Sequence, residues 1–223
     1  MKGTLSFLNP ISFGCLIWMA LGCTEVSRSQ QPNVVIIFCD DLGYGDIGPF
    51  GHPTIKTPNL DKMAVEGQKW TNFYAAAPVC TPSRAGLMTG RLPIRSGMCS
   101  ENRRVLFPDS EGGLPESEIT IAKQLKEVGY ATACVGKWHL GHLEPFTANA
   151  HGFDHYYGIP YSNDMDRLEG LAHYESCVNP KVEYFQVPLI RNQEIVEKQA
   201  DQKTITRKYT QEAIHFMDQN KEQ

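Results

Sequence analysis

The hydrophobic pattern of the chain points first to two buried strands. Residues 34–38 (Val-Val-Ile-Ile-Phe) and 130–135 (Tyr-Ala-Thr-Ala-Cys-Val) are apolar at nearly every position rather than at alternate ones. Such runs are typical of strands covered on both faces of a parallel sheet. We expect 34–38 to be a central strand, with Cys39 as a buried small hydrophobe, and 130–135 to be a further buried strand. The stretch 69–75 is expected to be a strand or extended segment with its aromatic side chains in the core.

Apolar residues at helical spacing appear between and after these strands. The stretch 57–67 begins with Thr57 as its cap and ends at Gly67, as helices commonly do. Two further amphipathic stretches cover 120–129 and 204–220. The alternation of strands and helices predicts an α/β fold with a mostly parallel central sheet flanked by helices.

The first 22 residues have the pattern of a signal peptide. Lys2 supplies a positive start, and residues 11–22 form an uncharged apolar run that is too short to cross a bilayer. Cleavage before Cys23 would leave a cysteine that can be lipidated as in bacterial lipoproteins, although Ala20 stands where leucine is usual. We predict export to the periplasm, the outer membrane or the medium, or to the lysosome in a eukaryote, with membrane contact only through an anchor at Cys23.

Composition narrows the classes of function. The net charge is −4 and the pI is about 6.0, so no general attraction to nucleic acid or to anionic membranes is expected. None of the seven cysteines forms a C-x-x-C pair, which argues against a structural zinc site. Cys99, Cys134 and Cys177 could include a disulfide in an oxidising compartment, in a pairing that the sequence does not specify.

Two adjacent carboxylates, Asp40 and Asp41, follow the first predicted strand. The carboxyl ends of strands are where open α/β sheets place ligands. A divalent cation with oxygen ligands would satisfy both carboxylates. A solvated Asp-Gly turn, in which the carboxylates bond to local N–H groups, explains the same residues and remains open.

The segment 79–91 (Val-Cys-Thr-Pro-Ser-Arg-Ala-Gly-Leu-Met-Thr-Gly-Arg) gathers reactive groups within one helical turn. We expect Cys80 just before a helix that has Pro82 in its first turn. Arg84, four residues after Cys80, would then lie on the same face. Free N–H groups at the helix start and the Arg84 guanidinium suit a tetrahedral oxyanion.

A second strand end delivers further polar groups at Gly136-Lys137-Trp138-His139. In an extended segment Lys137 and His139, two residues apart, face the same way. One ammonium and one imidazole would therefore meet on one side of the sheet. A histidine in the core or on the surface, without a chemical role, is the open alternative.

These motifs together resemble those of the type I, formylglycine-dependent sulfatases, close to the arylsulfatase A group. The resemblance runs from about residue 33 to 165 and is carried by five blocks. These are Asp40-Asp41-Leu42-Gly43-Tyr44-Gly45-Asp46, Cys80-Thr81-Pro82-Ser83-Arg84, Leu87-Met88-Thr89-Gly90-Arg91, Gly136-Lys137-Trp138-His139-Leu140-Gly141 and Gly158-Ile159-Pro160-Tyr161-Ser162. The resemblance implies an alkaline phosphatase-like sandwich, with residues 31–223 forming the N-terminal part of the catalytic domain.

The resemblance also implies that Cys80 is a precursor. A maturation enzyme would oxidise it to formylglycine, whose hydrate attacks the sulfur of a sulfate ester and is later regenerated as the aldehyde. Asp40, Asp41 and the modified Cys80 would bind calcium. By the same resemblance, Arg84 would hold the hydrate and Lys137 would contact the hydrate and a sulfate oxygen. His139 would accept a proton during sulfate release, and Ser162 would hydrogen-bond near the hydrate.

The chain departs from the family pattern as well. The Asp-Asn-Gly turn with the remaining metal ligands, a second lysine and a second histidine have no match, and we expect them beyond Gln223. Asp40, Asp41 and modified Cys80 offer too few oxygens for tight calcium binding. We therefore expect a truncated or split sulfatase with poor or no activity alone.

Two alternatives stay open on sequence grounds. A phosphoester or phosphonate hydrolase of the same superfamily would use similar residues, because sulfate and phosphate have similar shapes. A non-catalytic, exported binding module could keep the fold and leave Cys80 as a thiol.

Overall fold

The computed structural model describes residues 31–221. The predicted signal peptide at 1–22 and the lipidation site at Cys23 lie outside the described residues. The chain divides into two compact units, residues 1–42 and residues 43–223, and each is described by itself. Within 31–221, every helix is too short or too polar to cross a membrane.

The described part of the first unit, residues 31–42, contains neither helix nor strand. The central strand expected at 34–38 is therefore wrong for this structure, and its five apolar side chains are 42–73% exposed. Cys39, expected to be buried, is exposed as well. A buried strand needs hydrogen-bonded neighbours on both sides, and no described strand pairs with 34–38.

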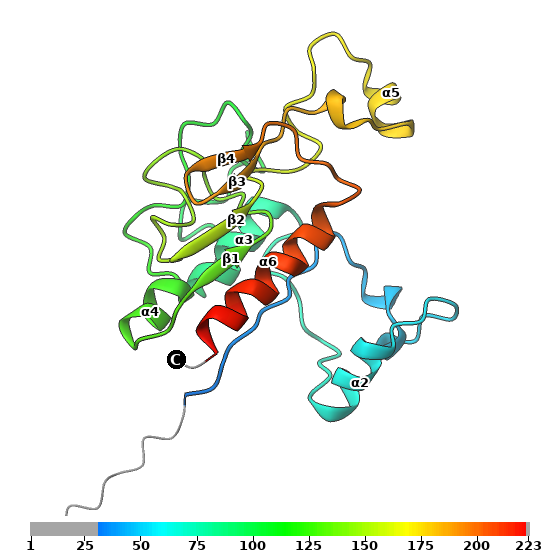
Figure 1. The fold of residues 1–223 in the computed structure, drawn as a ribbon, viewed down its shortest axis with the longest axis vertical. Helices are drawn as coiled ribbons and strands as arrows, with labels where there is room; N and C mark the ends of the chain where they lie inside the picture. Colours follow the sequence, from blue (N-terminus) through cyan, green and yellow to red (C-terminus); the bar gives the residue numbers. More distant parts are fainter. Residues whose placement is uncertain (1–30, 222–223) are drawn as a thin grey trace, which may run out of the picture. The chain divides into compact units, whose positions relative to one another are not determined.

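The second unit is built on a four-stranded mixed sheet (Figure 1). The strands, in spatial order, are β1 (Ala133–Val135), β2 (His155–Gly158), β3 (Leu189–Arg191) and β4 (Glu194–Glu197). β1 and β2 are parallel, whereas β2–β3 and β3–β4 are antiparallel. The α/β class is confirmed, but among the described residues the sheet is mixed rather than mostly parallel, because the short β3–β4 hairpin continues it.

Helices account for most of the remaining regular structure. They are α2 (Pro58–Glu66), α3 (Cys80–Thr89), α4 (Ile121–Glu127), α5 (His173–Val178) and α6 (Ile205–Asn220), with short 3₁₀ turns at Tyr44–Asp46, Gly48–Phe50 and Val182–Tyr184. The helices expected at 57–67, 120–129 and 204–220 are thus confirmed. The Thr120 hydroxyl accepts a hydrogen bond from the Lys123 N–H and caps α4, as a helix-starting threonine should.

Two hydrophobic cores lie on the two faces of the sheet. Tyr156 and Tyr157 are consecutive in β2, so their side chains point to opposite faces. Tyr156 joins a core with Ala85 of α3 and Trp138. Tyr157 joins a second core with Ile205 of α6, and α6 crosses this face over β1 and β2 (Figure 1). The sheet is therefore sandwiched between α3 and α6.

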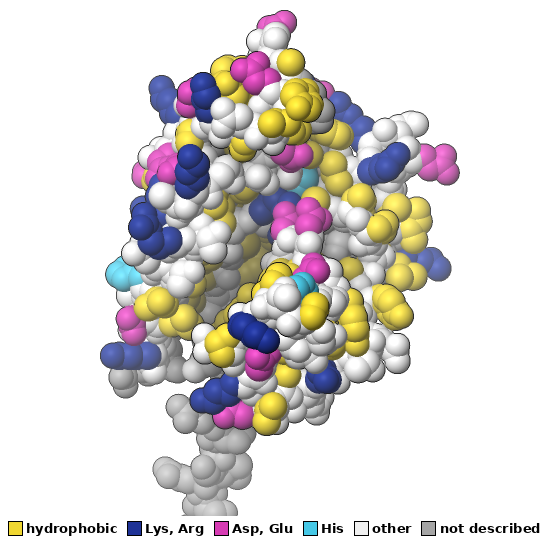
Figure 2. Space-filling model, turned by 90° about the vertical axis from the view of Figure 1, so that its right-hand side faces the viewer, with side chains coloured by type: hydrophobic (Ala, Val, Ile, Leu, Met, Phe, Trp, Pro, Cys, Tyr) yellow, Lys and Arg dark blue, Asp and Glu magenta, His cyan; other side chains and the backbone are white. Residues whose placement is uncertain are grey.

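The segment after α2 differs from expectation. Trp70, Phe73 and Tyr74 are 61–81% exposed, and 69–75 contains no strand. The core expected there is wrong for this structure. Figure 2 shows that groups of hydrophobic side chains lie on the surface of the molecule.

Candidate active site

Cys80 opens helix α3. It is the first helical residue rather than the residue before the helix, and the extended residue Val79 is the N-cap. The Ser83 N–H donates to the Val79 carbonyl at 3.1 Å, which closes the first turn. Pro82 lies buried in that turn, where its missing N–H costs no hydrogen bond. The half-buried Cys80 side chain is thus held on a rigid helix start.

Lys137 and Arg84 converge on this helix start. The Lys137 ammonium donates to Cys80 Sγ at 3.4 Å. Arg84 Nη1 donates to the Lys137 carbonyl oxygen at 2.6 Å. One residue of the segment after β1 therefore contacts both ends of the Cys80–Arg84 turn, and its ammonium lies beside the cysteine.

His139 is joined to the same turn through Thr81 and Leu106. The buried Thr81 hydroxyl donates to the His139 carbonyl at 3.1 Å and accepts from the Leu106 N–H at 3.0 Å. The imidazole Nε2 of His139 contacts the Leu106 carbonyl oxygen at 2.7 Å. The histidine side chain is completely buried, so its ring is fixed by the loop that follows α3.

The backbone after β1 is not a regular strand. Gly136 and His139 have positive φ angles of 120° and 57°, so the alternation of side chains in an extended segment is not what orients Lys137 and His139. Instead, N–H groups of the segment bond to the end of β2 and the residues after it. Gly136 N donates to Tyr157 O, Trp138 N to Ile159 O and His139 N to Pro160 O, at 2.9–3.1 Å.

The guanidinium of Arg84 lies in an apolar environment that sequence reasoning did not identify. Burial raises the pKa of the Cys134 thiol to about 12, although the nearby Arg84 charge opposes the shift. Burial also raises the pKa of the Tyr156 hydroxyl, again against Arg84. Both groups stay neutral, and both lie near Arg84 on the strands β1 and β2. Cys99 and Cys134 are both free thiols, so they do not form a disulfide with each other.

The other predicted site residues are placed differently. Asp40 and Asp41 are exposed residues of the first unit, and Asp41 has a φ of 55°. Ser162 is half-buried and its carbonyl accepts from the Met165 N–H. Among residues 31–221 there is no group of three or more His, Cys, Asp or Glu side chains arranged to hold a metal ion. The calcium site and the role of Ser162 stay predictions.

Two connecting residues were missed in the sequence, for different reasons. Thr81 lies inside the cysteine motif, but its spacing from His139 gives no signal of a contact 58 residues away. Leu106 acts through its backbone, so its side-chain type carries no information about the contact.

Comparison with known proteins identifies the family of the chain. The sulfatase family model matches residues 32–223. The chain belongs to the sulfatase family. Arylsulfatase G of Canis lupus familiaris is 42% identical over 226 residues, which cover 95% of this chain and 42% of that protein. Arylsulfatase A of Bos taurus is 48% identical over 150 residues, covering 66% of this chain and 29% of that protein.

Structural similarity leads to the same family. The crystal structure of Ps i-CgsB matches with a TM-score of 0.69 and 35% identity, covering 85% of this chain and 42% of that one. The family and fold expected from the sequence are confirmed. The chain spans less than half the length of these relatives.

Proposed function

We propose that this sulfatase-family chain carries the cysteine-bearing part of an enzyme that hydrolyses sulfate esters. The observation that supports the proposal most directly is the contact between Lys137 Nζ and Cys80 Sγ, with Arg84 bonded to the same lysine residue. The Lys137 ammonium and the N–H groups of the helix start suit a sulfate group. The family match over 32–223 supports the same reaction.

Oxidation of Cys80 to formylglycine would supply a hydrated aldehyde with a hydroxyl nucleophile for sulfur. Cys80 Sγ in this structure stands for the hydroxyl oxygens of that group. Lys137 Nζ would therefore donate to a hydroxyl and to a sulfate oxygen. Arg84, held by its bond to Lys137, would stabilise the negative charge that develops.

His139 and Ser162 complete the proposed set. The imidazole of His139 is buried beside the cysteine turn. Its Nε2–H donates to the Leu106 carbonyl oxygen, so a proton transferred as sulfate leaves would go to Nδ1. Ser162 follows Pro160, whose carbonyl accepts from the His139 N–H, and would hydrogen-bond near the hydrate.

Calcium is part of the proposal, although the described residues do not make a complete site for it. Asp40, Asp41 and the modified Cys80 would provide oxygen ligands. These are fewer than the about six to eight that Ca²⁺ takes. Water and substrate oxygens would provide further ligands.

The proposal includes export and a maturation partner. A formylglycine-generating enzyme would act on Cys80. The apolar residues 11–22 would direct the chain out of the cytoplasm. Membrane contact would arise only through lipidation of Cys23, and no nucleic-acid partner is proposed.

The test uses the chain co-produced with a formylglycine-generating enzyme. Mass spectrometry of the tryptic peptide 70–84 should show a mass below that of the same peptide with an unmodified Cys80. If the peptide from the native host instead carried an unmodified thiol, a non-catalytic binding module would be favoured. Rates of a full-length relative on 4-nitrophenyl sulfate and 4-nitrophenyl phosphate should favour sulfate, whereas preference for phosphate would favour the phosphoester hydrolase. In that relative, replacement by methionine of the lysine that matches Lys137 should reduce the sulfate rate by about 10²-fold or more. Replacement of the residue that matches Glu194, an exposed site on β4, should not reduce it.

A further inference from the structure

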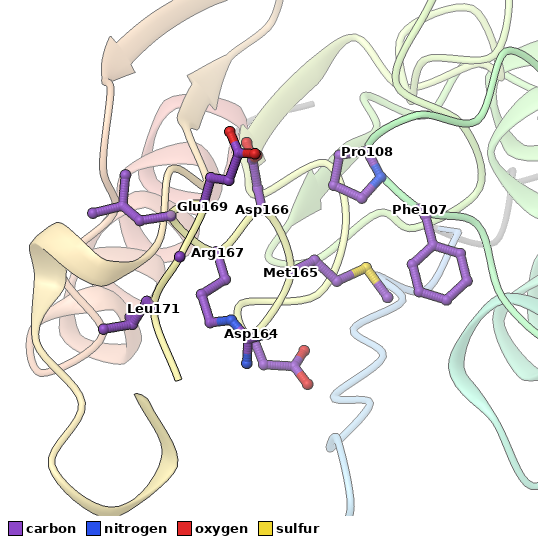
Figure 3. Close-up of a pocket in the computed structure, with 10 residues that line it drawn as sticks. Phe107, Pro108, Asp164, Met165, Asp166, Arg167, Glu169 and Leu171 are labelled. Atoms are coloured by element: carbon purple, nitrogen blue, oxygen red, sulfur yellow. The ribbon is translucent and has the colours of Figure 1, made fainter. Parts of the chain in front are cut away.

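A buried hydroxyl lies next to the candidate active site, on the face of the sheet that α3 covers. It belongs to Tyr156 of β2. The pocket drawn in Figure 3, with a volume of about 430 Å³, is a separate feature that is lined by Phe107, Pro108 and residues 164–171. In the part of the chain that the structure describes, none of the candidate site residues lines that pocket.

Tyr156 is fixed by its backbone and by its packing. Its N–H donates to Asn192 Oδ1 at 2.9 Å, and its carbonyl accepts from the Asn192 N–H at 2.8 Å. Its side chain is 4% exposed and lies in one core with Ala85, the residue after Arg84 in α3. Its cross-strand partner in β1 is Cys134, which packs against the same core. The tyrosine ring is therefore held beneath α3.

The hydroxyl at the end of this ring is buried and has no hydrogen-bond partner among residues 31–221. An unpaired buried hydroxyl destabilises a protein, and phenylalanine would fill the same space without this cost. Such groups are rare in native proteins. Exceptions of this kind are expected at functional sites, where a local cost is tolerated for the sake of activity.

The positive charge that acts on the Tyr156 hydroxyl is that of Arg84. Burial raises the pKa of Tyr156, and the Arg84 charge opposes this rise. The neutral hydroxyl oxygen can accept a hydrogen bond, and a guanidinium has several N–H donors in a fixed plane. One of these donors, on Nη1, bonds to the Lys137 carbonyl at 2.6 Å. Arg84 therefore lies between the buried tyrosine and the lysine residue of the candidate site.

We propose that Tyr156 is a positioning residue: its hydroxyl accepts a hydrogen bond from the Arg84 guanidinium while sulfate is bound beside Cys80 and Lys137. The inference rests on the proposed function. The bond keeps Arg84 on the Lys137 carbonyl, and Lys137 Nζ lies 3.4 Å from Cys80 Sγ. Tyr156 acts through Arg84 and not on the anion itself. Its setting favours the bond, because a hydrogen bond to a charged group is strong in a buried, apolar environment.

Calorimetric titration of the full chain with inorganic sulfate tests this role. Tyr156→Phe removes the hydroxyl and keeps the ring, and we expect it to bind sulfate about tenfold more weakly than wild type. Its urea midpoint should equal or exceed that of wild type, because the hydroxyl has no hydrogen bond to lose. Tyr157→Phe is the matched control. That ring lies on the opposite face of the sheet, beneath Arg191, so its sulfate affinity should change by less than about twofold.

A second measurement reports on Arg84 itself and separates positioning from a general effect on the fold. In sulfate-bound protein with isotope-labelled arginine, nuclear magnetic resonance gives the rate at which the Arg84 guanidinium rotates about its Nε–Cζ bond. The rotation should be faster in Tyr156→Phe than in wild type and unchanged in Tyr157→Phe. In an Arg84→Lys background, Tyr156→Phe should cause no further loss of sulfate affinity, because its effect passes through the guanidinium.

The outcomes distinguish the inference from the proposed function. If wild type bound sulfate and Tyr156→Phe kept the wild-type affinity and rotation rate, the inference would be overturned and the proposed function would stand. A lower urea midpoint for Tyr156→Phe would mean that the hydroxyl has another partner, and a full loss of affinity in the Arg84→Lys background would mean that it does not act through Arg84. Either result would also overturn the inference. Failure of wild type to bind sulfate would overturn both.

Discussion

A Cβ atom on Gly158 would lie 1.7 Å from the carbonyl oxygen of Gly136. The Gly136 N–H also donates to the Tyr157 carbonyl at 2.9 Å, so the end of β2 and the segment leading to Lys137 touch backbone to backbone. No side chain fits at position 158 without separating them.

Gly158→Ala should therefore reduce the free energy of unfolding by about 3 kcal/mol or more, measured by urea unfolding. It should also reduce sulfate binding, because Lys137 follows Gly136 directly. Gly112→Ala is the matched control, since its Cβ would meet no atom within 4 Å. Equal stability of the two variants would contradict the close approach.

The Thr81 hydroxyl should contribute measurably to stability. It joins the His139 carbonyl to the Leu106 N–H in a buried position, and Thr81→Val would leave both backbone groups without this partner. We expect a loss of about 2–4 kcal/mol, seen as a lower urea midpoint with an unchanged slope. Thr81→Ser, which keeps the hydroxyl, should lose less than half as much free energy of unfolding as Thr81→Val. If the two variants lost similar amounts, the methyl group rather than the hydroxyl would be the cause.

His151 should make the protein less stable in acid. Burial lowers the pKa of His151, assisted by the charge of Lys123 and opposed by its bond to the Leu114 carbonyl. His151 is therefore protonated less readily in the folded state than in the unfolded state. Its neutral form makes its full contribution to the free energy of unfolding above pH 6.5. Below pH 6.5 the free energy of unfolding declines, by at most about 1.4 kcal/mol per pH unit.

This decline is measured from urea midpoints between pH 5 and 7.5. His151→Gln should flatten it, at the cost of a lower midpoint at pH 7. His215→Gln, at an exposed position on α6, should keep the wild-type slope. An unchanged slope in His151→Gln would assign the pH dependence to other groups.

Glu212 should anchor α6 to the sheet. Its carboxylate accepts from Arg191 Nη2 at 2.7 Å and contacts His155 Nε2 at 2.8 Å. Burial opposes its ionisation, but the hydrogen bonds and charges of Arg191 and His155 lower its pKa overall. Its contribution is therefore present above pH 4.5 and is lost as the pH falls through its lowered pKa.

Glu212→Gln should cost about 1–2 kcal/mol at pH 7 and accelerate hydrogen exchange of α6 amides. The difference from wild type should shrink in acid. Asp218→Asn, at an exposed site on the same helix, should change neither quantity. A constant difference at every pH would mean that the ionised carboxylate is not the cause.

Local signals predicted the helices well, because caps and apolar spacing lie within each segment. Thr120 and Gly67 mark helix ends in sequence and in structure. The strands were predicted less well. Residues 34–38 form no strand despite a strong pattern, because strand formation depends on a partner that the pattern does not supply. The β3–β4 hairpin, turned at Asn192 with a φ of 54°, was missed because its strands are short.

The candidate site was predicted in part. The motif spacing indicated that Cys80 and Arg84 share one helical turn, and they do. It did not indicate that Lys137 would bridge them through both its ammonium and its carbonyl. The burial of Arg84 near Cys134 and Tyr156 depends on how β1 and β2 pack against α3, which is a property of the folded chain.

The exposed run at 34–38 bears on solubility. Five apolar, mostly β-branched residues without proline can pair with the same segment of another copy and start aggregation. Pro32 precedes the run, and Asp40 and Asp41 follow it. Proline and like charges at the ends of such a segment act as gatekeepers against this pairing. We therefore expect the acid pair proposed for calcium to oppose this pairing as well, and we expect replacement of both carboxylates to lower the solubility of the chain.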